Sequence, residues 1–183
     1  MANFSACDLE EIIDPTGQLL EQEVSLIRKA LGGNPTYSTE KSVIADFDHE
    51  AYYQRLLLTA ILPTFRFKAR LECDNRYDIS LFDGDSVVAR GELKCYMGGP
   101  QKNIAGMKKD MKEKLSDVCC SKFLVVFTKN PKCAADKNIA FLFDKLGCSG
   151  NTCHRYSFDT IYPYGSNEIE QNGQFGVIGI LLQ

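Results

Sequence analysis

Residues 76–94 read RYDISLFDGDSVVARGELK, and this stretch is the most informative part of the chain. Apolar and polar residues alternate on both sides of the turn-forming segment DGDS at 83–86. Because successive side chains of a strand point to opposite faces of a sheet, this alternation predicts a β-hairpin. Its strands are expected to run from Arg76 to Phe82 and from Val87 to Lys94.

The two faces of this hairpin differ in chemistry. One face is apolar and holds Tyr77, Ile79, Leu81, Val87, Ala89, Gly91, Leu93 and Cys95. The other face is polar and holds Asp78, Ser80, Arg90, Glu92, Lys94 and Tyr96. A three-residue loop at 84–86 would bring both apolar sets onto a common face and set Asp78 directly opposite Glu92.

The opposed carboxylates suggest a specific chemistry. Directly opposed residues lie roughly 5 Å apart at Cβ, so Asp78 and Glu92 repel each other unless a cation lies between them. Two carboxylates beside Lys94 are what a hard divalent metal and the charge developing on a phosphate require. The alternative interpretation is an ordinary solvated sheet face with surface charges.

The chain of 183 residues is long enough for one domain with a proper core. Its apolar fraction of 44% and charged fraction of 25% are those of an ordinary soluble globular protein. No stretch has the length of a membrane span, and the N-terminus has no basic segment followed by an apolar run. We therefore expect a cytoplasmic protein without a membrane partner.

The net charge of −3 conceals an asymmetry along the chain. Residues 1–50 hold ten acidic and three basic side chains, whereas residues 51–183 hold fourteen acidic and eighteen basic ones. An excess of basic side chains in one part of a chain is typical of a protein with a polyanionic partner. The second part is therefore the better candidate for a working surface.

Eight cysteines occur in the chain. Without an export signal, reduced thiols are the favoured interpretation. Cys148, Cys153 and His154, with Cys133 as a further ligand, form the one cluster to weigh as a zinc site. Zinc sites usually contain two tight Cys-x-x-Cys pairs, which this chain lacks, so a zinc-stabilised scaffold remains only an alternative.

The remaining patterns give the order of the other elements. Helical spacing predicts helices at 17–31, from about Asp48 to Leu62, over about fifteen residues after Pro100, and at 134–146. Strands are predicted at 65–73, 123–127, 155–162 and 175–182. The strand at 123–127 is apolar throughout, as in a strand buried on both faces. This order predicts an α/β fold with a mixed β-sheet flanked by helices.

Asp78, then Glu92-Leu93-Lys94 on the next strand, a lysine-bearing helix and a buried strand together resemble the PD-(D/E)xK nuclease superfamily. The resemblance covers about residues 48–128 of a single nuclease-like domain at 1–183, with 1–47 as an N-terminal helical extension. It implies a restriction-endonuclease-like αβββαβ core. The proline that often precedes the aspartate in this superfamily is replaced by Tyr77.

The resemblance assigns roles to particular residues. It implies that Asp78, Glu92 and the Leu93 carbonyl bind Mg²⁺ or Mn²⁺, that Lys94 acts in catalysis with the two carboxylates, and that Glu50 completes the site. Glu50 has an alternative role, because a carboxylate in the first turn of a helix also interacts favourably with the positive helix N-terminus.

Histidine and basic residues extend this set. In viral cap-snatching endonucleases of the superfamily a helix histidine is a metal ligand that favours Mn²⁺, and His49-Glu50-Ala51-Tyr52 loosely resembles that helix. His49 is otherwise an incidental residue at a helix start. Lys108, Lys112 and Arg90 are candidates for phosphate contacts, which give affinity without base information. For Lys108 and Lys112 a solvated helix face is the alternative.

The leading functional hypothesis is a metal-dependent endonuclease that hydrolyses phosphodiester bonds in DNA, in defence, restriction or repair. The alternatives are an RNA endonuclease of the cap-snatching type and a catalytically silent nucleic-acid-binding or interaction module. The expected partner is a nucleic acid, with DNA favoured over RNA. A two-fold homodimer is expected if both strands of a symmetric site are cut.

Overall fold

The computed structural model describes residues 4–30, 50–63, 65–73, 77–96, 101–116, 119–148, 150–163 and 170–182. Its helices are α1 (Ala6–Ala30), α3 (Glu50–Ile61), α4 (Gln101–Lys114) and α5 (Ala135–Leu146). Its strands are β1 (Lys68–Cys73), β2 (Tyr77–Asp83), β3 (Ser86–Tyr96), β4 (Ser121–Pro131), β5 (Thr152–Pro163) and β6 (Glu170–Leu182). The predicted α/β class is confirmed.

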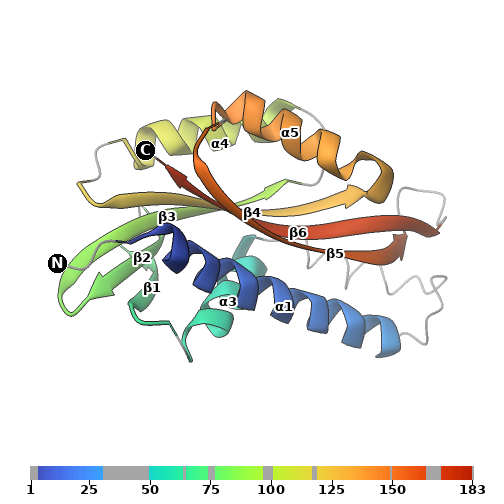
Figure 1. The fold of residues 1–183 in the computed structure, drawn as a ribbon, viewed down its shortest axis with the longest axis horizontal. Helices are drawn as coiled ribbons and strands as arrows, with labels where there is room; N and C mark the ends of the chain where they lie inside the picture. The colour runs from blue at the N-terminus through green and yellow to red at the C-terminus, as the bar shows by residue number, and fades with distance from the viewer. Residues whose placement is uncertain are drawn as a thin grey trace.

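One mixed sheet of six strands, in the order β1-β2-β3-β4-β6-β5, forms the middle layer. Helices α1 and α3 lie on one face of this sheet, and α4 and α5 lie on the other (Figure 1). Strands β3 and β4 are parallel and are joined through α4, whereas the other neighbouring strands are antiparallel. The predicted mixed sheet with flanking helices is therefore present.

The hairpin of β2 and β3 has the predicted register in its central part. Ile79 pairs with Gly91, and Ser80 pairs with Arg90. Continued by one residue, the same register sets Asp78 opposite Glu92, as the alternation predicted.

The connection between the two strands differs from the prediction. Asp83 pairs with Ser86, which leaves only Gly84 and Asp85 in the turn, and Gly84 has a φ of 59° that favours glycine. The register then shifts by one residue between Leu81 and Phe82. A shorter turn and a β-bulge together give the same register as the three-residue loop that the sequence predicted.

Both faces of the hairpin are covered. Ile79, Leu81 and Leu93 are fully buried in the core cluster that includes the apolar residues of α1 and α3. On the opposite face, Asp78 is only 8% exposed and Glu92 is 0% exposed. The interpretation of the polar face as a solvated sheet face is therefore wrong, because the α4–α5 layer covers it.

Strand β4 has the burial that its uniformly apolar sequence predicted. Phe123, Val125 and Phe127 pack in the cluster on the α1–α3 side, whereas Leu124 and Val126 pack in the cluster on the α4–α5 side. Glu92 and Lys94 of β3 lie beside Leu124 and Val126 in the parallel ladder. Glu92 and Lys94 thus lie next to a strand that is buried on both faces.

Helix α1 begins well before the predicted start at residue 17 and is part of the layer that covers the sheet. It packs against α3, β5 and β6. Ser5 and Asp8 exchange hydrogen bonds at its start, in the manner of a capping box. Pro15 lies inside the helix and cannot donate to a preceding carbonyl, while the Thr16 hydroxyl donates to the Ile12 carbonyl at 2.6 Å.

The C-terminal half follows the predicted order. Helix α5 ends at Gly147, whose φ of 71° lets its N–H bond back to the last turn. Strands β5 and β6 are longer than the predicted segments and pair with each other along their whole length. In the part of the chain that the structure describes, no helix is long and apolar enough to cross a membrane.

Candidate functional site

Asp78, Glu92 and Lys94 lie together on the sheet face under α4. The Lys94 Nζ is 3.4 Å from Glu92 Oε2 and 3.7 Å from Asp78 Oδ2, so one ammonium is shared by both carboxylates. The exposed fraction of the side chain is 12% for Asp78, 0% for Glu92 and 11% for Lys94. The predicted juxtaposition of two carboxylates and a lysine is therefore present.

Helix α4 adds two charged side chains that the sequence pattern had not placed here. Lys114 Nζ lies 2.8 Å from Glu92 Oε2 and 4.0 Å from Asp78 Oδ1. Asp110 Oδ2 lies 3.0 Å from Lys94 Nζ. The site is thus a network of three carboxylates and two ammonium groups, in which every lysine contacts at least two carboxylates.

A signal for these two residues was present in the sequence. Asp110 and Lys114 are four residues apart on α4. Met107 and Leu115, which are close to them in the sequence, are both only 2% exposed. Residues at this spacing share a helix face. A charged pair of opposite sign next to buried apolar positions therefore indicates that the helix places charges toward a polar part of the sheet.

The backbone of β3 takes part in the site through Leu93. Its N–H donates a hydrogen bond of 2.8 Å to Asp78 Oδ2, which fixes the carboxylate against the neighbouring strand. In an extended strand the N–H and C=O of one residue point to the same side. The Leu93 carbonyl is therefore directed toward the strand that carries Asp78, while its side chain is fully buried in the opposite core.

Glu92 has an unusual electrostatic environment. Burial raises its pKa from 4.5 to about 7, and the nearby Asp78 charge raises it too, although Lys114 and Lys94 act in the opposite direction. The Lys114 pKa is raised above its ordinary value because its hydrogen bond and charge contact with Glu92 outweigh its own desolvation. One oxygen of Glu92, Oε1, is buried and finds no hydrogen-bond partner among the described residues.

Ser80 has a second buried polar atom on the same face. Its Oγ is buried and, within the described ranges, makes no hydrogen bond. Ser80 lies two residues after Asp78 on β2, so its side chain points to the same side of the sheet as the carboxylate. Unpaired buried polar atoms are costly, so Ser80 Oγ and Glu92 Oε1 are two groups on this face that a further hydrogen-bonding or charged partner would stabilise.

Glu50 and His49, the two metal ligands predicted near the start of α3, are only partly described by the structure. Glu50 is the first residue of α3, but its side chain lies outside the described residues, as does His49 entirely. The buried residues of α3 pack on the other side of the sheet from Asp78 and Glu92, for example Tyr53, whose ring stacks on Phe127 at 4.1 Å. Metal binding by Glu50 and His49 stays a prediction.

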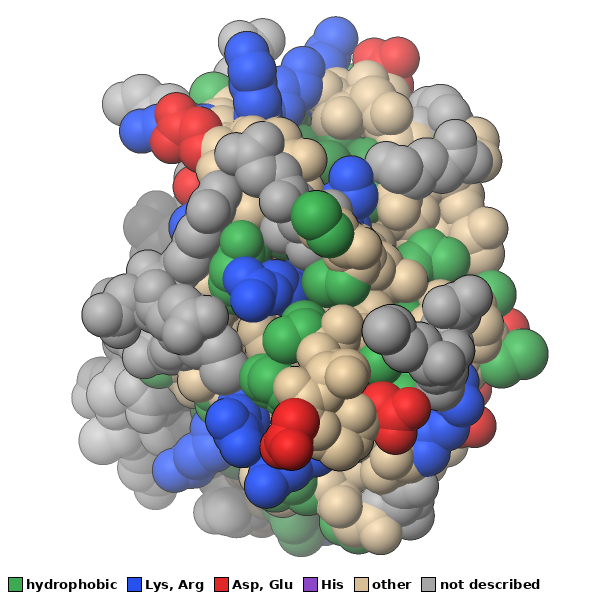
Figure 2. All heavy atoms as spheres, turned by 90° about the vertical axis from the view of Figure 1, so that its left-hand side faces the viewer, with side chains coloured by type: hydrophobic (Ala, Val, Ile, Leu, Met, Phe, Trp, Pro, Cys, Tyr) green, Lys and Arg blue, Asp and Glu red, His purple; other side chains and the backbone are tan. Residues whose placement is uncertain are grey.

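The predicted phosphate-binding residues have different settings. Lys108 and Lys112 are exposed on α4. The Arg90 guanidinium lies over the Tyr77 ring, 4.1 Å from its centroid, and is partly buried. Figure 2 shows lysine and arginine side chains in several separate groups among acidic and apolar ones on one side of the molecule. Nucleic-acid contacts by these residues stay predictions.

The cysteine and histidine cluster weighed as a zinc site is not brought together. His154 faces α1, where its Nε2 lies 2.7 Å from Asp14 Oδ1, whereas Cys148 is buried beside α5 on the other side of the sheet. Cys153 is exposed. Among the described residues, no group of three or more His, Cys, Asp or Glu side chains is arranged to hold a metal ion.

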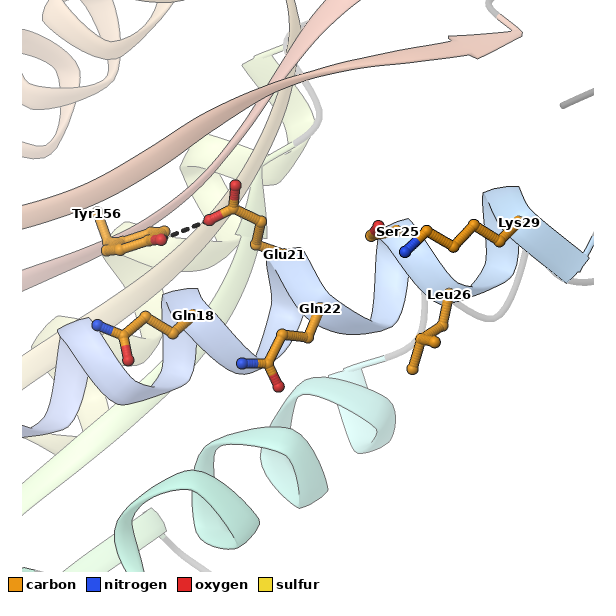
Figure 3. A pocket seen from close by; sticks show the side chains of 7 residues that line it. All are labelled: Gln18, Glu21, Gln22, Ser25, Leu26, Lys29 and Tyr156. Atoms are coloured by element: carbon orange, nitrogen blue, oxygen red, sulfur yellow. Dashed lines mark hydrogen bonds between the residues drawn. The ribbon is translucent and has the colours of Figure 1, made fainter.

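A shallow groove of about 540 Å³ lies along the outer side of α1 (Figure 3). It is lined by both polar and apolar surface of Gln18, Glu21, Gln22, Ser25, Leu26, Lys29 and Tyr156. The Tyr156 hydroxyl donates a 2.5 Å hydrogen bond to Glu21, which holds this part of α1 to β5. The groove belongs to the opposite layer from the charged network.

No protein-family model matches the chain, and no curated protein is similar enough to it to count as a relative. The charged network and the order of the elements around it are therefore the features that bear on function.

Proposed function

We propose that this chain is a metal-dependent endonuclease that hydrolyses phosphodiester bonds in DNA. The observation that carries the proposal is the shared ion pairing of Lys94 with Asp78 and Glu92 on one face of adjoining strands. The succession α3, β1, β2, β3, α4 and β4 supports a restriction-endonuclease-like core, because the nuclease superfamily that residues 48–128 resemble has the order αβββαβ.

The donor set fits Mg²⁺ or Mn²⁺. Asp78, Glu92 and the Leu93 carbonyl offer oxygen atoms of the kind that hard divalent cations prefer, and Glu92 Oε1 lacks another described partner. Two carboxylates and a carbonyl do not complete an octahedral shell. Mg²⁺ usually keeps several waters and takes phosphate oxygens of the substrate, so an incomplete protein shell suits this reaction.

A metal ion at these residues would polarise the phosphodiester and lower the pKa of a bound water. Lys94, which lies within 4 Å of both carboxylates, would donate a hydrogen bond to the attacking water or to an oxygen that gains negative charge. Glu92 must be ionised to act as a ligand, and because its pKa is raised to about 7, metal binding competes with a proton near neutral pH.

The substrate assignment depends on charge rather than on base recognition. The exposed Lys108 and Lys112 lie on α4, the same helix that contributes Asp110 and Lys114 to the network. Lysines along one helix next to the carboxylates would hold the phosphates of a bound strand near the reacting group. DNA is the substrate that we favour, with RNA as the competing substrate in the test.

The test is a nuclease assay on single-stranded and double-stranded DNA and RNA, with Mg²⁺, Mn²⁺ or EDTA. We expect cleavage of DNA that requires the metal and is lost in Lys94→Ala. The matched control is Lys109→Ala, because Lys109 is an exposed lysine of α4 that is paired only with its neighbour Glu113 in the described contacts. The control should keep its activity.

Three other outcomes would redirect the assignment. Metal-dependent cleavage of RNA alone, best with Mn²⁺ and lost on His49→Ala, would favour the cap-snatching alternative. Nucleic-acid binding without cleavage, and without metal binding that depends on Asp78 and Glu92, would favour the catalytically silent module. Undiminished cleavage by Lys94→Ala would remove the residue on which the proposed site is centred.

A further inference from the structure

We infer that Lys114 is a built-in counter-cation, which neutralises Glu92 in the metal-free protein and is displaced when a divalent metal binds. The inference rests on the proposed function, because it concerns how a metal ion reaches the same carboxylates. It assigns to Lys114 a positioning role that is separate from that of Lys94.

The exposure of the five charged side chains sets a direction for entry. Glu92 is 0% exposed, and Asp78 and Lys94 are 12% and 11% exposed, whereas Lys114 and Asp110 are each 32% exposed. The two side chains of α4 are thus the ones nearest to solvent. Of these two, Lys114 is the one in direct contact with Glu92, at 2.8 Å, so it is the exposed group that an ion binding to Glu92 meets.

The charge balance explains why a lysine must leave. Three carboxylates face two ammonium groups, so the set carries one net negative charge when all five groups are ionised. A divalent cation added to the intact set would bring four positive charges against three negative ones. Like charges a few ångströms apart in a poorly solvated place repel strongly, so one ammonium group is expected to move away.

Lys114 is the ammonium that can move more easily. It is the last residue of α4, its side chain is about a third exposed, and its closest contact is to one carboxylate. Lys94 lies within 4 Å of three carboxylates and projects from a central strand. A displaced Lys114 stays at the entrance of the site, where its flexible stem lets it meet a phosphate of the substrate.

The first test measures metal affinity by calorimetry with Mg²⁺ at about pH 9, because loss of Lys114 removes a contact that lowers the Glu92 pKa and would otherwise strengthen competition by a proton. In Lys114→Met the competing charge is gone, so we expect metal binding at least about tenfold tighter than in the wild type. Lys114→Arg keeps the charge, and Lys109→Met removes an exposed lysine of the same helix. Both controls should bind the metal as the wild type does, within about twofold.

The second test needs no variant. Lysines of the wild-type protein are acetylated with an amine-reactive ester, with and without saturating Mg²⁺, and the labelling rate of each lysine is read by mass spectrometry. Metal binding should raise the rate at Lys114 by about threefold or more, because an amine released from an ion pair is more accessible. The rate at Lys109, which is 67% exposed on the same helix, should not change.

The results separate this inference from the proposed function. Equal metal affinity of wild type and Lys114→Met, or a Lys114 labelling rate that the metal does not change, overturns the counter-cation role and leaves the nuclease proposal standing. Metal binding by neither protein overturns both. If Lys114→Met does not fold, shown by its circular dichroism spectrum, the labelling experiment on the wild type decides.

Discussion

Lys114 Nζ lies 2.8 Å from Glu92 Oε2 and so joins the end of α4 to a fully buried carboxylate of β3. This contact is made across the crossover that links two parallel strands. A charge-assisted hydrogen bond with one partner in the core is worth more than a surface ion pair, because removal of the other partner leaves an uncompensated buried charge.

The stability of the metal-free protein should therefore depend on this pair. We expect Lys114→Met to lower the free energy of unfolding by about 1–3 kcal/mol above pH 7, measured by urea denaturation in EDTA. In a Glu92→Gln background the same substitution should cost much less, since the fully buried charge in direct contact with Lys114 is gone. A double-mutant cycle without coupling between the two sites would contradict the prediction.

Glu92 should also make stability depend on pH. Its pKa in the folded protein is raised to about 7 from 4.5, so between these values the folded state keeps a proton that the unfolded state has lost. Folding is favoured by this difference at low pH, and the advantage is lost as the pH rises toward 7. At about 1.4 kcal/mol per pKa unit, the loss is on the order of 3 kcal/mol.

The measurement is the unfolding free energy of wild type and Glu92→Gln from about pH 4.5 to pH 8 in EDTA. Glu92→Gln should remove most of the decline, because its amide does not titrate. Glu113→Gln is the matched control, since Glu113 is 61% exposed on α4. Parallel curves for wild type and Glu92→Gln would show that Glu92 is not the cause.

The carboxylates and the two α4 residues differ in how far sequence could identify them. Strand alternation placed Asp78, Glu92 and Lys94 on one face because the period of a strand is local and needs no knowledge of neighbours. Asp110 and Lys114 belong to a helix whose rotation depends on the packing of α4 onto the sheet. A sequence pattern predicts that the polar residues of an amphipathic helix face solvent. This prediction is wrong where the helix lies over a polar part of the sheet, as α4 does here.

The turn and the first helix show two other limits of local patterns. Gly84 and the bulge after Leu81 give the expected register by a different route, because register is fixed by the buried face and turns adapt to it. The apolar spacing of Leu9, Ile12 and Ile13 continues the helical pattern across Pro15. Burial of these side chains against the sheet offsets the backbone hydrogen bond that Pro15 cannot make. This burial is a tertiary effect, so a local sequence pattern does not reveal it.

Gly91 should be intolerant of a side chain although it lies in a regular strand. A Cβ at this position would lie 2.5 Å from the Phe123 ring and 2.9 Å from Ile79 Cγ2, both in the core beneath the site. Overpacking of this kind costs about 1–3 kcal/mol. Gly91→Ala should therefore lower the melting temperature, measured by calorimetry.

Gly106 provides the matched control for this substitution. It lies in α4, and a Cβ there would meet nothing within 4 Å. Gly106→Ala should raise stability by about 0.5–1 kcal/mol, because glycine in a helix interior is unfavourable relative to alanine. A Gly91→Ala variant as stable as Gly106→Ala would mean that Phe123 has room to move.

The last prediction concerns Asp78 itself. In Asp78→Asn the side-chain oxygen still accepts the hydrogen bond from the Leu93 N–H, so the fold should be kept, with a melting temperature close to that of the wild type. The negative charge that a metal ligand requires is lost, so metal-dependent cleavage should fall by at least about a hundredfold and metal affinity by about tenfold or more. Asp83→Asn is the control, because Asp83 is an exposed acid at the turn of the same hairpin.

Two readouts make this test decisive, because they separate loss of the fold from loss of chemistry. Circular dichroism and thermal unfolding report whether Asp78→Asn keeps the strand pairing, while cleavage and calorimetry report the site. A folded Asp78→Asn protein that cleaves DNA as fast as Asp83→Asn would show that the carboxylate is a structural partner of Leu93 and Lys94 only. The site would then have to be sought elsewhere in the charged network, with Asp110 as the next carboxylate to substitute.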